Sequence, residues 1–318
     1  MPEELIIYDK FDHELQKFWS TFEKQKQNPF LNYQINKTWY DIFGEDVKLR
    51  IITDMSDFIA PMIIKEDIAC FCGGKDLFDY HNFIFKKGIS RELVKSIFDH
   101  LFIKDKVNKI ELNSISDNSD LHQCLLNLQN DYAIEFVNED VSPSINLPES
   151  FEVYLSNLSK KNRHEIRRKI RKFENNFQFK IIKANSKNIE KLLLEFIKLM
   201  KLNLEKKLFL NLKRIEFMTK IIKDSVLENS GELNFIEINN DLVSTTFSFK
   251  NDKKLFVYNS GFNNEYAEYS VGLMNHVYNI KDNIGSYTNI DFLRGNEEYK
   301  YRIGCKDKNL LTINIKNN

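Results

Sequence analysis

Hydrophobic residues recur along the first half of the chain with two different periods. Apolar and polar residues alternate in VKLRIIT, which predicts a strand at 47–53, whereas Leu93, Ile97 and Leu101 recur at helical spacing. These patterns predict a mixed α/β unit. The predicted helices are 11–27, 33–43 and 89–102, and the predicted strands are 47–53, 58–64, 80–85 and 107–112.

The second half has a more regular order of elements. The pattern predicts helices at 154–174, 188–207, 212–229 and 270–283, and strands at FQFKIIKA, ELNFIEIN, DLVSTTFSFK, KLFVYNSGF, YTNIDFLRG and LLTINI. Short turns at Asn239–Asn240 and Asn251–Asp252 join three of these strands into an antiparallel meander. A meander followed by a β-α-β step is typical of an α+β fold, and no Rossmann glycine fingerprint occurs.

A domain boundary is expected at VSPSINLPES, residues 141–150, where two prolines and three serines interrupt both periods. We therefore predict one domain at 1–145 and a second at 146–318. The charge changes sign at the same point. Residues 1–150 carry 16 Lys and Arg against 26 Asp and Glu, and residues 151–318 carry 30 against 20. A basic second domain favours a polyanionic ligand such as a nucleotide cofactor there.

Composition narrows the class of protein. With 42% hydrophobic and 29% charged residues, the 318-residue chain is globular, and no apolar run is long enough to span a bilayer. Four scattered cysteines favour a reducing compartment, and the acidic N-terminus does not resemble a signal peptide, so we expect a cytoplasmic protein. Cys70 and Cys72 lack the additional ligands that zinc needs, and we predict no metal.

Three strings in the second half resemble the BioF2-like acetyltransferase family of the GNAT superfamily: LSKKNRHEIRRKIRKFE, LFVYNSGFNNEYAEYSVGLM and DFLRGNEEYKYRIG. That family includes the CelD-type polysaccharide-biosynthesis proteins and is related to the FemAB peptidyltransferases. The first half is similar only through NPFLNYQINKTWYDIFG and LFDYHNFIF. The resemblance implies two tandem GNAT-like units, a degenerate one at 1–145 and a working acyltransferase at 146–318.

The resemblance also implies an activity, the transfer of an acetyl or short acyl group from acyl-CoA to a primary amine. The acceptor would be a small molecule or nucleotide sugar, such as an amino sugar or another cell-envelope precursor, and not DNA. One alternative is FemAB-like transfer of an aminoacyl group from tRNA, which a basic helix would suit. Another is a GNAT-fold binding module without turnover, because the usual Q/R-x-x-G-x-G/A phosphate signature is absent here.

The loop NSGFNNEYAEYSVG is the expected cofactor site. In a GNAT fold the pantetheine of CoA runs beside the preceding strand, and the pyrophosphate binds free N–H groups at the next helix start. Ser270 can cap that helix and Gly272 lets phosphate approach, so valine at 272 is expected to abolish CoA binding while leaving the fold intact. The alternative is a helix cap without a ligand. The candidate cofactor-binding residues are Tyr258, Asn259, Ser260, Ser270, Val271 and Gly272.

The string DFLRGNEEYKYRIG is the most specific candidate for chemistry. N-acylation needs a base for the amine and a donor for the oxyanion and the leaving thiolate. Asp291 or Glu297 could be the base and Tyr299 or Lys300 a donor, and analogy with FemAB proteins makes Lys300 a binder of substrate phosphate. Arg294 and Tyr299 are also substrate-binding candidates. The alternative is a structural ion pair between Asp291 and Arg294.

Two further candidates lie outside that string. Eight of the thirteen residues from Lys160 to Lys172 are Lys or Arg. This pattern predicts a solvated cationic face, a contact with an anionic substrate through Arg167, or a contact with a nucleic acid or a membrane. Tyr269 is the preferred acid for the CoA thiolate, although a buried tyrosine is the commoner explanation. His276 falls on an apolar face and is expected to be a core residue.

Overall fold

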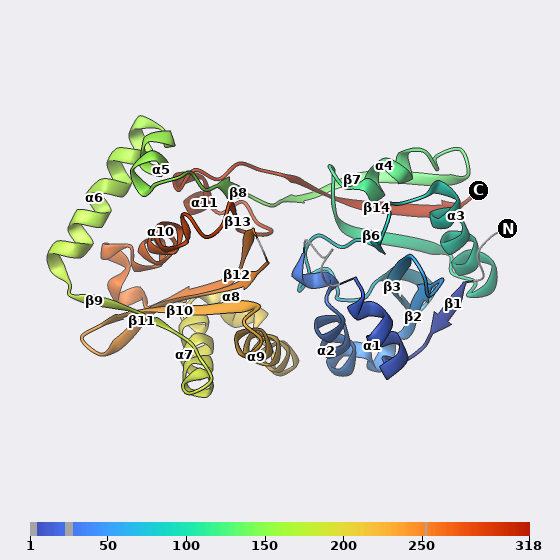
Figure 1. Cartoon of the computed structure of the whole chain (residues 1–318), viewed down its shortest axis with the longest axis horizontal. Coiled ribbons are helices and arrows are strands. Elements are labelled where there is room, and N and C mark those ends of the chain that lie inside the picture. Colours follow the sequence, from blue (N-terminus) through green and yellow to red (C-terminus); the bar gives the residue numbers. More distant parts are fainter. Residues whose placement is uncertain (1–4, 23–27, 252) are drawn as a thin grey trace. The chain divides into compact units, whose positions relative to one another are not determined.

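The computed structural model describes residues 5–22, 28–251 and 253–318. The chain divides into two compact units (Figure 1). Unit 1 comprises Met1–Val141 and Lys308–Asn318, and unit 2 comprises Ser142–Asp307.

Unit 1 is built on a mixed sheet whose strand order is β1-β2-β3-β4-β6-β14-β7, with β5 paired to β3. Of the strand pairs in this sheet, β4–β6 is parallel and the others are antiparallel, among the described residues. The strands are β1 Ile6–Tyr8, β2 Lys48–Thr53, β3 Phe58–Lys65, β4 Ile68–Phe71, β5 Ile84–Phe85, β6 Lys109–Ser116, β7 Tyr132–Val141 and β14 Asn309–Asn317. The α-helices are α1 His13–Ser20, α2 Tyr33–Phe43, α3 Arg91–Asp99 and α4 Asp120–Leu126.

The position of β14 corrects the predicted domain division. We predicted that the second domain would run from 146 to 318, but β14 pairs with β6 and β7 of unit 1 and lies outside unit 2. Burial explains this return, because Ile313 and Ile315 are fully buried in the core of unit 1. The structure also places the change between units at Val141–Ser142, four residues before the predicted boundary.

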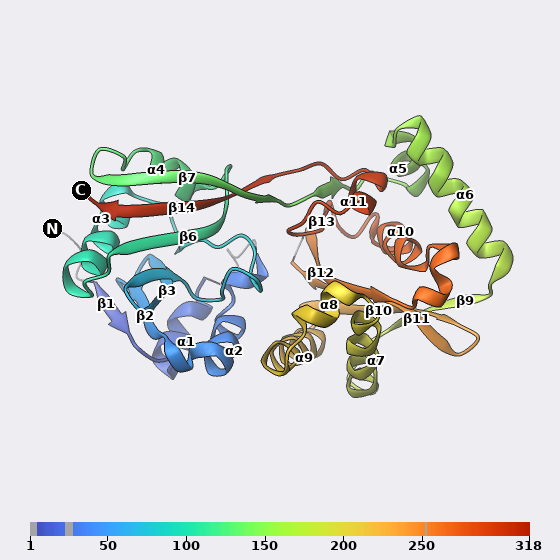
Figure 2. The same cartoon turned by 180° about the vertical axis from the view of Figure 1, so that it is seen from behind.

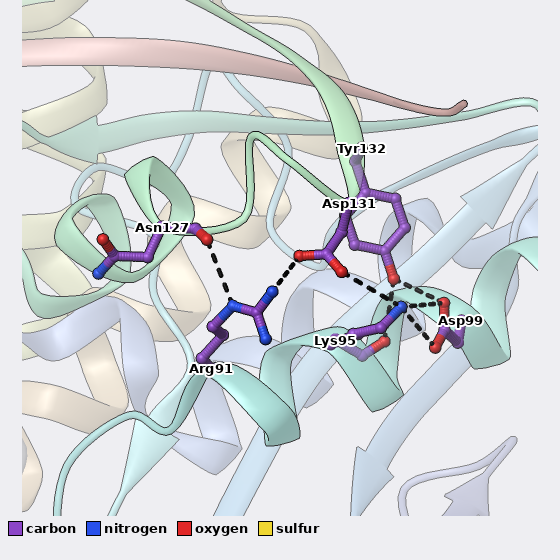
Figure 3. A network of polar contacts seen from close by, with 6 residues as sticks. All are labelled: Arg91, Lys95, Asp99, Asn127, Asp131 and Tyr132. Carbon is purple, nitrogen blue, oxygen red and sulfur yellow. Dashed lines mark hydrogen bonds and ion pairs between the residues drawn. The ribbon is translucent and has the colours of Figure 1, made fainter.

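A polar network fastens α3 to the start of β7 in unit 1 (Figure 3). The Tyr132 hydroxyl donates to Asp99 Oδ1 at 2.6 Å and contacts the Lys95 carbonyl oxygen at 3.2 Å. Arg91 pairs with Asp131, and its Nε donates to the Asn127 carbonyl at 3.3 Å. Burial, followed by the neighbouring Asp99 carboxylate, raises the pKa of Tyr132, so this hydroxyl remains a donor at neutral pH.

Unit 2 is built on a six-stranded sheet in the order β8-β13-β12-β11-β10-β9. The β12–β13 pair is parallel and the other pairs are antiparallel. The strands are β8 Ser144–Asn146, β9 Phe179–Lys183, β10 Gly231–Ile238, β11 Asp241–Lys250, β12 Lys254–Phe262 and β13 Asn289–Asp291. The predicted meander of β10, β11 and β12 is present, and Asn239 and Asn240 both have positive φ, as a two-residue hairpin turn of type I′ requires.

Helices cover both faces of this sheet (Figures 1 and 2). The hydroxyl of Thr246 on β11 bonds Asn275 of α10, so α10 lies on one face. Gly261 on β12 faces the other way, where a Cβ would lie 2.6 Å from the Met200 nitrogen of α7. The α-helices of unit 2 are α5 Phe151–Asn157, α6 Lys160–Asn176, α7 Ile189–Lys201, α8 Leu204–Phe209, α9 Leu212–Leu227, α10 Val271–Asn283 and α11 Glu298–Arg302.

Two predicted long helices are each divided in the structure. The predicted helix at 154–174 becomes α5 and α6, because Ser159 has extended backbone and caps α6 by accepting from Asn162 N–H. The predicted helix at 188–207 becomes α7 and α8, with Asn203 capping α8. Asn and Ser begin helices more readily than they continue them. Part of the predicted helix at 11–27 lies outside the described residues.

In the part of the chain that the structure describes, none of the helices has the length and apolar character needed to cross a bilayer. All four cysteines are free thiols, and Cys70 is the least buried of them.

Candidate functional site

Strands β12 and β13 part within the sheet of unit 2, and we call this place the fork. They pair in parallel only from Lys254–Asn289 to Phe256–Asp291, whereas β12 continues to Phe262. Among the described residues, no strand pairs with that edge of β12 beyond Phe256. The other edge of β12 pairs with β11 as far as Phe262. The fork therefore exposes strand edge that a ligand with amide groups can contact.

A β-bulge lies at the fork. Asn259 is opposite Phe247 and Val257 is opposite Ser248, so Tyr258 is an extra residue on β12. Bulges bend a strand and often occur beside functional sites. Three of the predicted cofactor residues, Tyr258, Asn259 and Ser260, follow one another here and are half-buried. The fork thus brings together the strand part of the predicted cofactor site.

The helix start at α10 differs from the prediction for Ser270. This residue has left-handed backbone, with φ 56° and ψ 41°, and its side chain does not cap the helix. Its hydroxyl instead accepts from Lys169 Nζ of α6 at 2.5 Å. The first N–H groups of any α-helix lack acceptors within the helix. In α10 these groups begin at Val271. The positive end of the α10 dipole and the Lys169 ammonium therefore lie together, which favours an anion.

A second lysine of α6 reaches the same loop. Lys172 Nζ donates to the Glu268 carbonyl oxygen at 3.0 Å and lies 4.7 Å from the ring centroid of Tyr269. The Tyr269 ring also packs edge-on against Phe177, with centroids 4.6 Å apart. Tyr269 therefore lies on the α6 side of the helix start, and none of its described contacts is with Asp291 or Glu297.

Gly272 has a packing role that the sequence did not reveal. A Cβ at this position would lie 2.8 Å from Cδ1 of the Phe262 ring, which is closer than real Cβ contacts. Valine at 272 would therefore disturb the packing of α10 on β12, and our expectation that it leaves the fold intact is wrong. Substitution of Gly272 cannot separate a phosphate contact from this packing.

Lys300 of the C-terminal string is buried and has several polar partners. Only 2% of its surface is exposed, and its ammonium bonds the carbonyl oxygens of Leu293, Arg294 and Gly295 at 3.1, 2.9 and 2.9 Å. It also lies 2.9 Å from Glu297 Oε2. An ammonium has three N–H donors, and four acceptors already surround this one. Lys300 holds the loop after β13 in place, and the structure leaves it no donor for the substrate phosphate that we predicted.

The backbone of that loop is strained. Leu293 has φ 53° and Gly295 has φ 110°, and both values lie in the left-handed region that disfavours side chains. A Cβ at Gly295 would lie 2.6 Å from Glu297 Oε2. The glycine thus allows the loop to fold back so that three carbonyl groups reach one ammonium.

Asp291 ends β13 and is 1% exposed. Its Oδ1 accepts from the Ser142 hydroxyl at 2.9 Å and from the Leu293 N–H at 3.0 Å. The carboxylate is therefore held rigidly at the fork, beside the loop that Lys300 fixes. Glu297 lies at the other end of the loop, where its side chain is 57% exposed and free to meet a substrate on one side.

The structure adds His276, which we expected to be only a core residue. Its ring stacks on Tyr299 with centroids 4.9 Å apart and planes inclined by 9°, and it meets Phe292 edge-on. Although only 4% of the residue is exposed, its Nδ1 has no hydrogen-bond partner among the described residues. Burial, and then the nearby charges of Lys206 and Lys300, lowers the pKa of His276 to about 3. The ring is neutral at physiological pH and fixes the plane of Tyr299.

Tyr299 lies on α11 and is half-buried against this imidazole. Its hydroxyl has no hydrogen bond within the described part of the chain, unlike the buried Tyr154 hydroxyl, which donates to the Ile303 carbonyl at 3.1 Å. Burial, followed by the charge of Glu297, raises the pKa of Tyr299, so the hydroxyl keeps its proton. A protonated phenol without a partner is a suitable proton donor.

The buried imidazole predicts a pH dependence of stability. In the unfolded chain a histidine binds a proton near pH 6.5, whereas in the folded chain the pKa of His276 is about 3. Between these values the unfolded state binds more protons, so stability falls as the pH decreases. We expect this residue alone to cost about 2.5 kcal/mol of unfolding free energy between pH 7 and pH 4.5.

The check is urea denaturation of the wild type and His276→Phe at both pH values. Phenylalanine preserves the stack on Tyr299 but cannot titrate, so the wild type should lose about 2.5 kcal/mol more than the variant on acidification. Equal losses in the two proteins would show that His276 does not titrate in this way.

Lys206 is a residue of the fork that the sequence did not single out. It lies on α8, and its Nζ donates to the Ser260 carbonyl and lies 3.5 Å from Ser260 Oγ. Nothing distinguishes it from Lys207 in the sequence, because only the fold brings α8 to β12. Arg167, by contrast, pairs with Glu152 of α5 at 3.0 Å and is not brought to the fork by any described contact.

The described residues contain no group of three or more His, Cys, Asp or Glu side chains arranged to hold a metal ion. The predicted absence of a metal therefore rests on the sequence. Arg294 is half-buried, and its carbonyl oxygen is one of those that bind Lys300.

Comparisons with known proteins agree with the geometry of unit 2. Residues 160–301 match the family model described as an acetyltransferase (GNAT) domain. No curated protein matches the chain in sequence.

Several solved structures have the same fold over nearly the whole chain. A conserved protein of unknown function from Bacteroides thetaiotaomicron VPI-5482 matches with a TM-score of 0.66 and 11% identity, covering 98% of this chain and 100% of that one. FemX matches with a TM-score of 0.64 and 10% identity, covering 97% and 96%. A tandem GNAT protein from the clavulanic acid biosynthesis pathway matches with a TM-score of 0.50 and 6% identity, covering 98% and 97%. These matches confirm the predicted α+β tandem GNAT-like fold.

Proposed function

We propose that the protein transfers an acetyl or similarly short acyl group from acyl-CoA to a primary amine, and the match of residues 160–301 to the acetyltransferase (GNAT) family model supports this. The observation that carries this proposal is the combination of the fork with the start of α10. The two are joined by Asn263 to Ser270, so one extended ligand can reach both. No metal takes part in this proposal.

The donor would lie with its pantetheine along the free edge of β12, from Tyr258 to Ser260, and its pyrophosphate at the N-terminus of α10. Three features of the α10 start support this placement. They are the N–H groups from Val271 onward, the helix dipole, and the ammonium of Lys169 on the Ser270 hydroxyl.

The chemistry would use the residues at the end of β13. We assign Asp291 to the activation or orientation of the acceptor amine, with Glu297 as the other candidate base. Tyr299 would protonate the leaving thiolate, because its hydroxyl has no other described partner and keeps its proton. We prefer Tyr299 to Tyr269 for this step, because Tyr269 contacts Phe177 and Lys172 at the α6 side.

The acceptor class follows from the sequence resemblance to BioF2-like and CelD-type proteins. We propose an amino sugar or another precursor of cell-envelope polysaccharides as acceptor. A cytoplasmic location is part of the proposal, because acyl-CoA and reduced cysteines belong to the same compartment. We also propose that unit 1, the degenerate GNAT-like part, binds no CoA.

A second candidate function is FemAB-like transfer of an aminoacyl group from tRNA. One observation favours it, the cationic surface of α6. Five of its eight basic residues are solvent-exposed, and they are Lys160, Lys161, Arg167, Arg168 and Arg171. Such a row of cations suits a nucleic-acid backbone.

The two functions differ in their donor, so the donor assay decides between them. Free thiol release from acetyl-CoA is measured with a panel of primary amines and nucleotide sugars. The proposal expects thiol release with at least one amine. Aminoacyl transfer from charged tRNA without any thiol release would favour the second candidate instead.

The placement of phosphate is tested by Lys169→Glu. Reversal of the charge beside the α10 N-terminus should weaken CoA binding by about ten-fold or more, as measured by isothermal titration calorimetry. Arg171→Glu makes the same charge change at an exposed position of the same helix and should alter the affinity by less than about two-fold. Equal weakening by both variants would indicate only a general charge effect.

A further inference from the structure

Lys206 occupies an unusual position for a lysine of a short surface helix. Its neighbour Lys207 on α8 is exposed, whereas Lys206 is half-buried and its Nζ bonds the Ser260 carbonyl oxygen. Ser260 lies on the part of β12 that has lost its β13 partner. The amine therefore lies at the fork, against the strand edge assigned above to the acyl-CoA donor.

The titratable groups around this amine come from three other elements of unit 2. Glu297 of the loop after β13 favours the charged form of Lys206, and Lys300 of α11 opposes it. His276 of α10 is neutral, and the charge of Lys206 contributes to its lowered pKa. Burial outweighs the attraction of Glu297 and lowers the pKa of Lys206 to about 8. At pH 7.5 about a quarter of such amines are neutral, against about a thousandth for a lysine with the ordinary pKa of about 10.4.

We propose that Lys206 is itself an acyl acceptor, so that the enzyme acylates its own active site when no amine substrate is bound. This inference rests on the proposed acyl-CoA donor. The neutral Nζ attacks the thioester carbonyl carbon, an N–C bond forms, and the C–S bond breaks. The Nζ loses one proton and the departing CoA thiolate gains one. The products are an N-acyl-lysine and CoA with a free thiol, and no further reactant is needed.

Acylation would change the fork in two ways. It removes the positive charge beside Glu297 and places an acyl group on a side chain that already reaches the β12 edge. The modified enzyme is therefore expected to bind the donor poorly. Preincubation with acetyl-CoA should reduce the rate of acceptor acylation over time, at least ten-fold when Lys206 is fully modified.

The test is peptide mapping by mass spectrometry after the full chain is incubated with acetyl-CoA in the absence of an amine acceptor. The expected result is one acetyl group, located on Lys206, added at least ten-fold faster than to Lys207. Lys206→Arg should abolish this addition, and Lys207→Arg should not affect it. Modification of both lysines at similar rates, or of neither, would overturn the proposal.

The pH dependence of labelling distinguishes the buried amine from surface reactivity. With a pKa of about 8, the neutral fraction of Lys206 rises about 25-fold from pH 6.5 to 8.5 and then levels off. The neutral fraction of a surface amine with a pKa of about 10.4 rises about 100-fold over the same interval and continues to rise at higher pH. A labelling rate at Lys206 that rises without levelling off would contradict the proposed environment.

Failure of this inference and failure of the proposed function give different results. If the chain binds CoA by calorimetry and acetylates an amine while Lys206 stays unmodified, only self-acylation is wrong. If the chain neither binds CoA nor releases thiol with any acceptor, the proposed donor is wrong and the inference falls with it.

Discussion

Replacing Lys300 with Met is expected to lower the unfolding free energy of the protein by about 3 kcal/mol. The aliphatic stem of methionine fills the space of the lysine side chain, but three carbonyl oxygens lose their shared donor, and Glu297 loses its cation. The left-handed backbone at Leu293 and Gly295 then loses the ammonium that holds its carbonyl groups, and the Asp291 contact with the Leu293 N–H remains. Urea denaturation measures the loss.

Arg302→Met is the matched control. Arg302 lies on the same helix, but its pair with Glu298 is exposed, with 46% and 78% of the two side chains accessible. Its replacement should change stability by no more than about 0.5 kcal/mol. If Lys300→Met keeps full stability and raises only the acceptor KM, Lys300 binds substrate, as analogy with FemAB proteins implied, and our structural assignment is wrong.

Replacing Asp291 with Asn is expected to reduce kcat by about 10²-fold or more while CoA affinity is retained. The amide oxygen can still accept from the Ser142 hydroxyl and the Leu293 N–H, so the loop keeps its anchor. What disappears is the negative charge that would activate or orient the acceptor amine. Steady-state kinetics and CoA titration measure the two effects separately.

Asp282→Asn is the control for a loss of one carboxylate, because Asp282 is exposed on α10. It should leave both constants within about two-fold of the wild type. A structural role for Asp291 predicts a different pattern, in which Asp291→Asn lowers the melting temperature but each folded molecule keeps nearly normal activity. That pattern would remove Asp291 from the chemistry.

Periodicity predicted the meander and the helices of unit 2 because their patterns are local. In α10, for example, Met274, Val277 and Ile280 recur on one buried face. The destination of the last strand could not be predicted in the same way. LLTINI has the alternation of any half-buried strand, and only the core of unit 1 decides that Ile313 and Ile315 are buried there. The hydrophobic pattern alone predicted single helices at 154–174 and 188–207, and the Ser and Asn caps that divide each of them do not change that pattern.

The candidate site was partly predictable for a similar reason. Tyr258 to Ser260 and the start of α10 are close in sequence, and a strand followed by a helix brings them to one end of the sheet. Lys206 comes to the fork from about 50 positions earlier, and no local pattern marks it. Lys300 was found from the sequence, but its partners were not, because backbone carbonyl groups carry no sequence signal. Its burial, and not its charge, determines what it does.

A crystal structure of the chain with bound CoA would show whether one acyl-CoA molecule spans the fork and the start of α10. We expect pantetheine along β12 from Tyr258 to Ser260, and pyrophosphate within hydrogen-bond distance of the N–H groups that follow Ser270. A structure that places the pyrophosphate against residues 70–80 of unit 1 would contradict it.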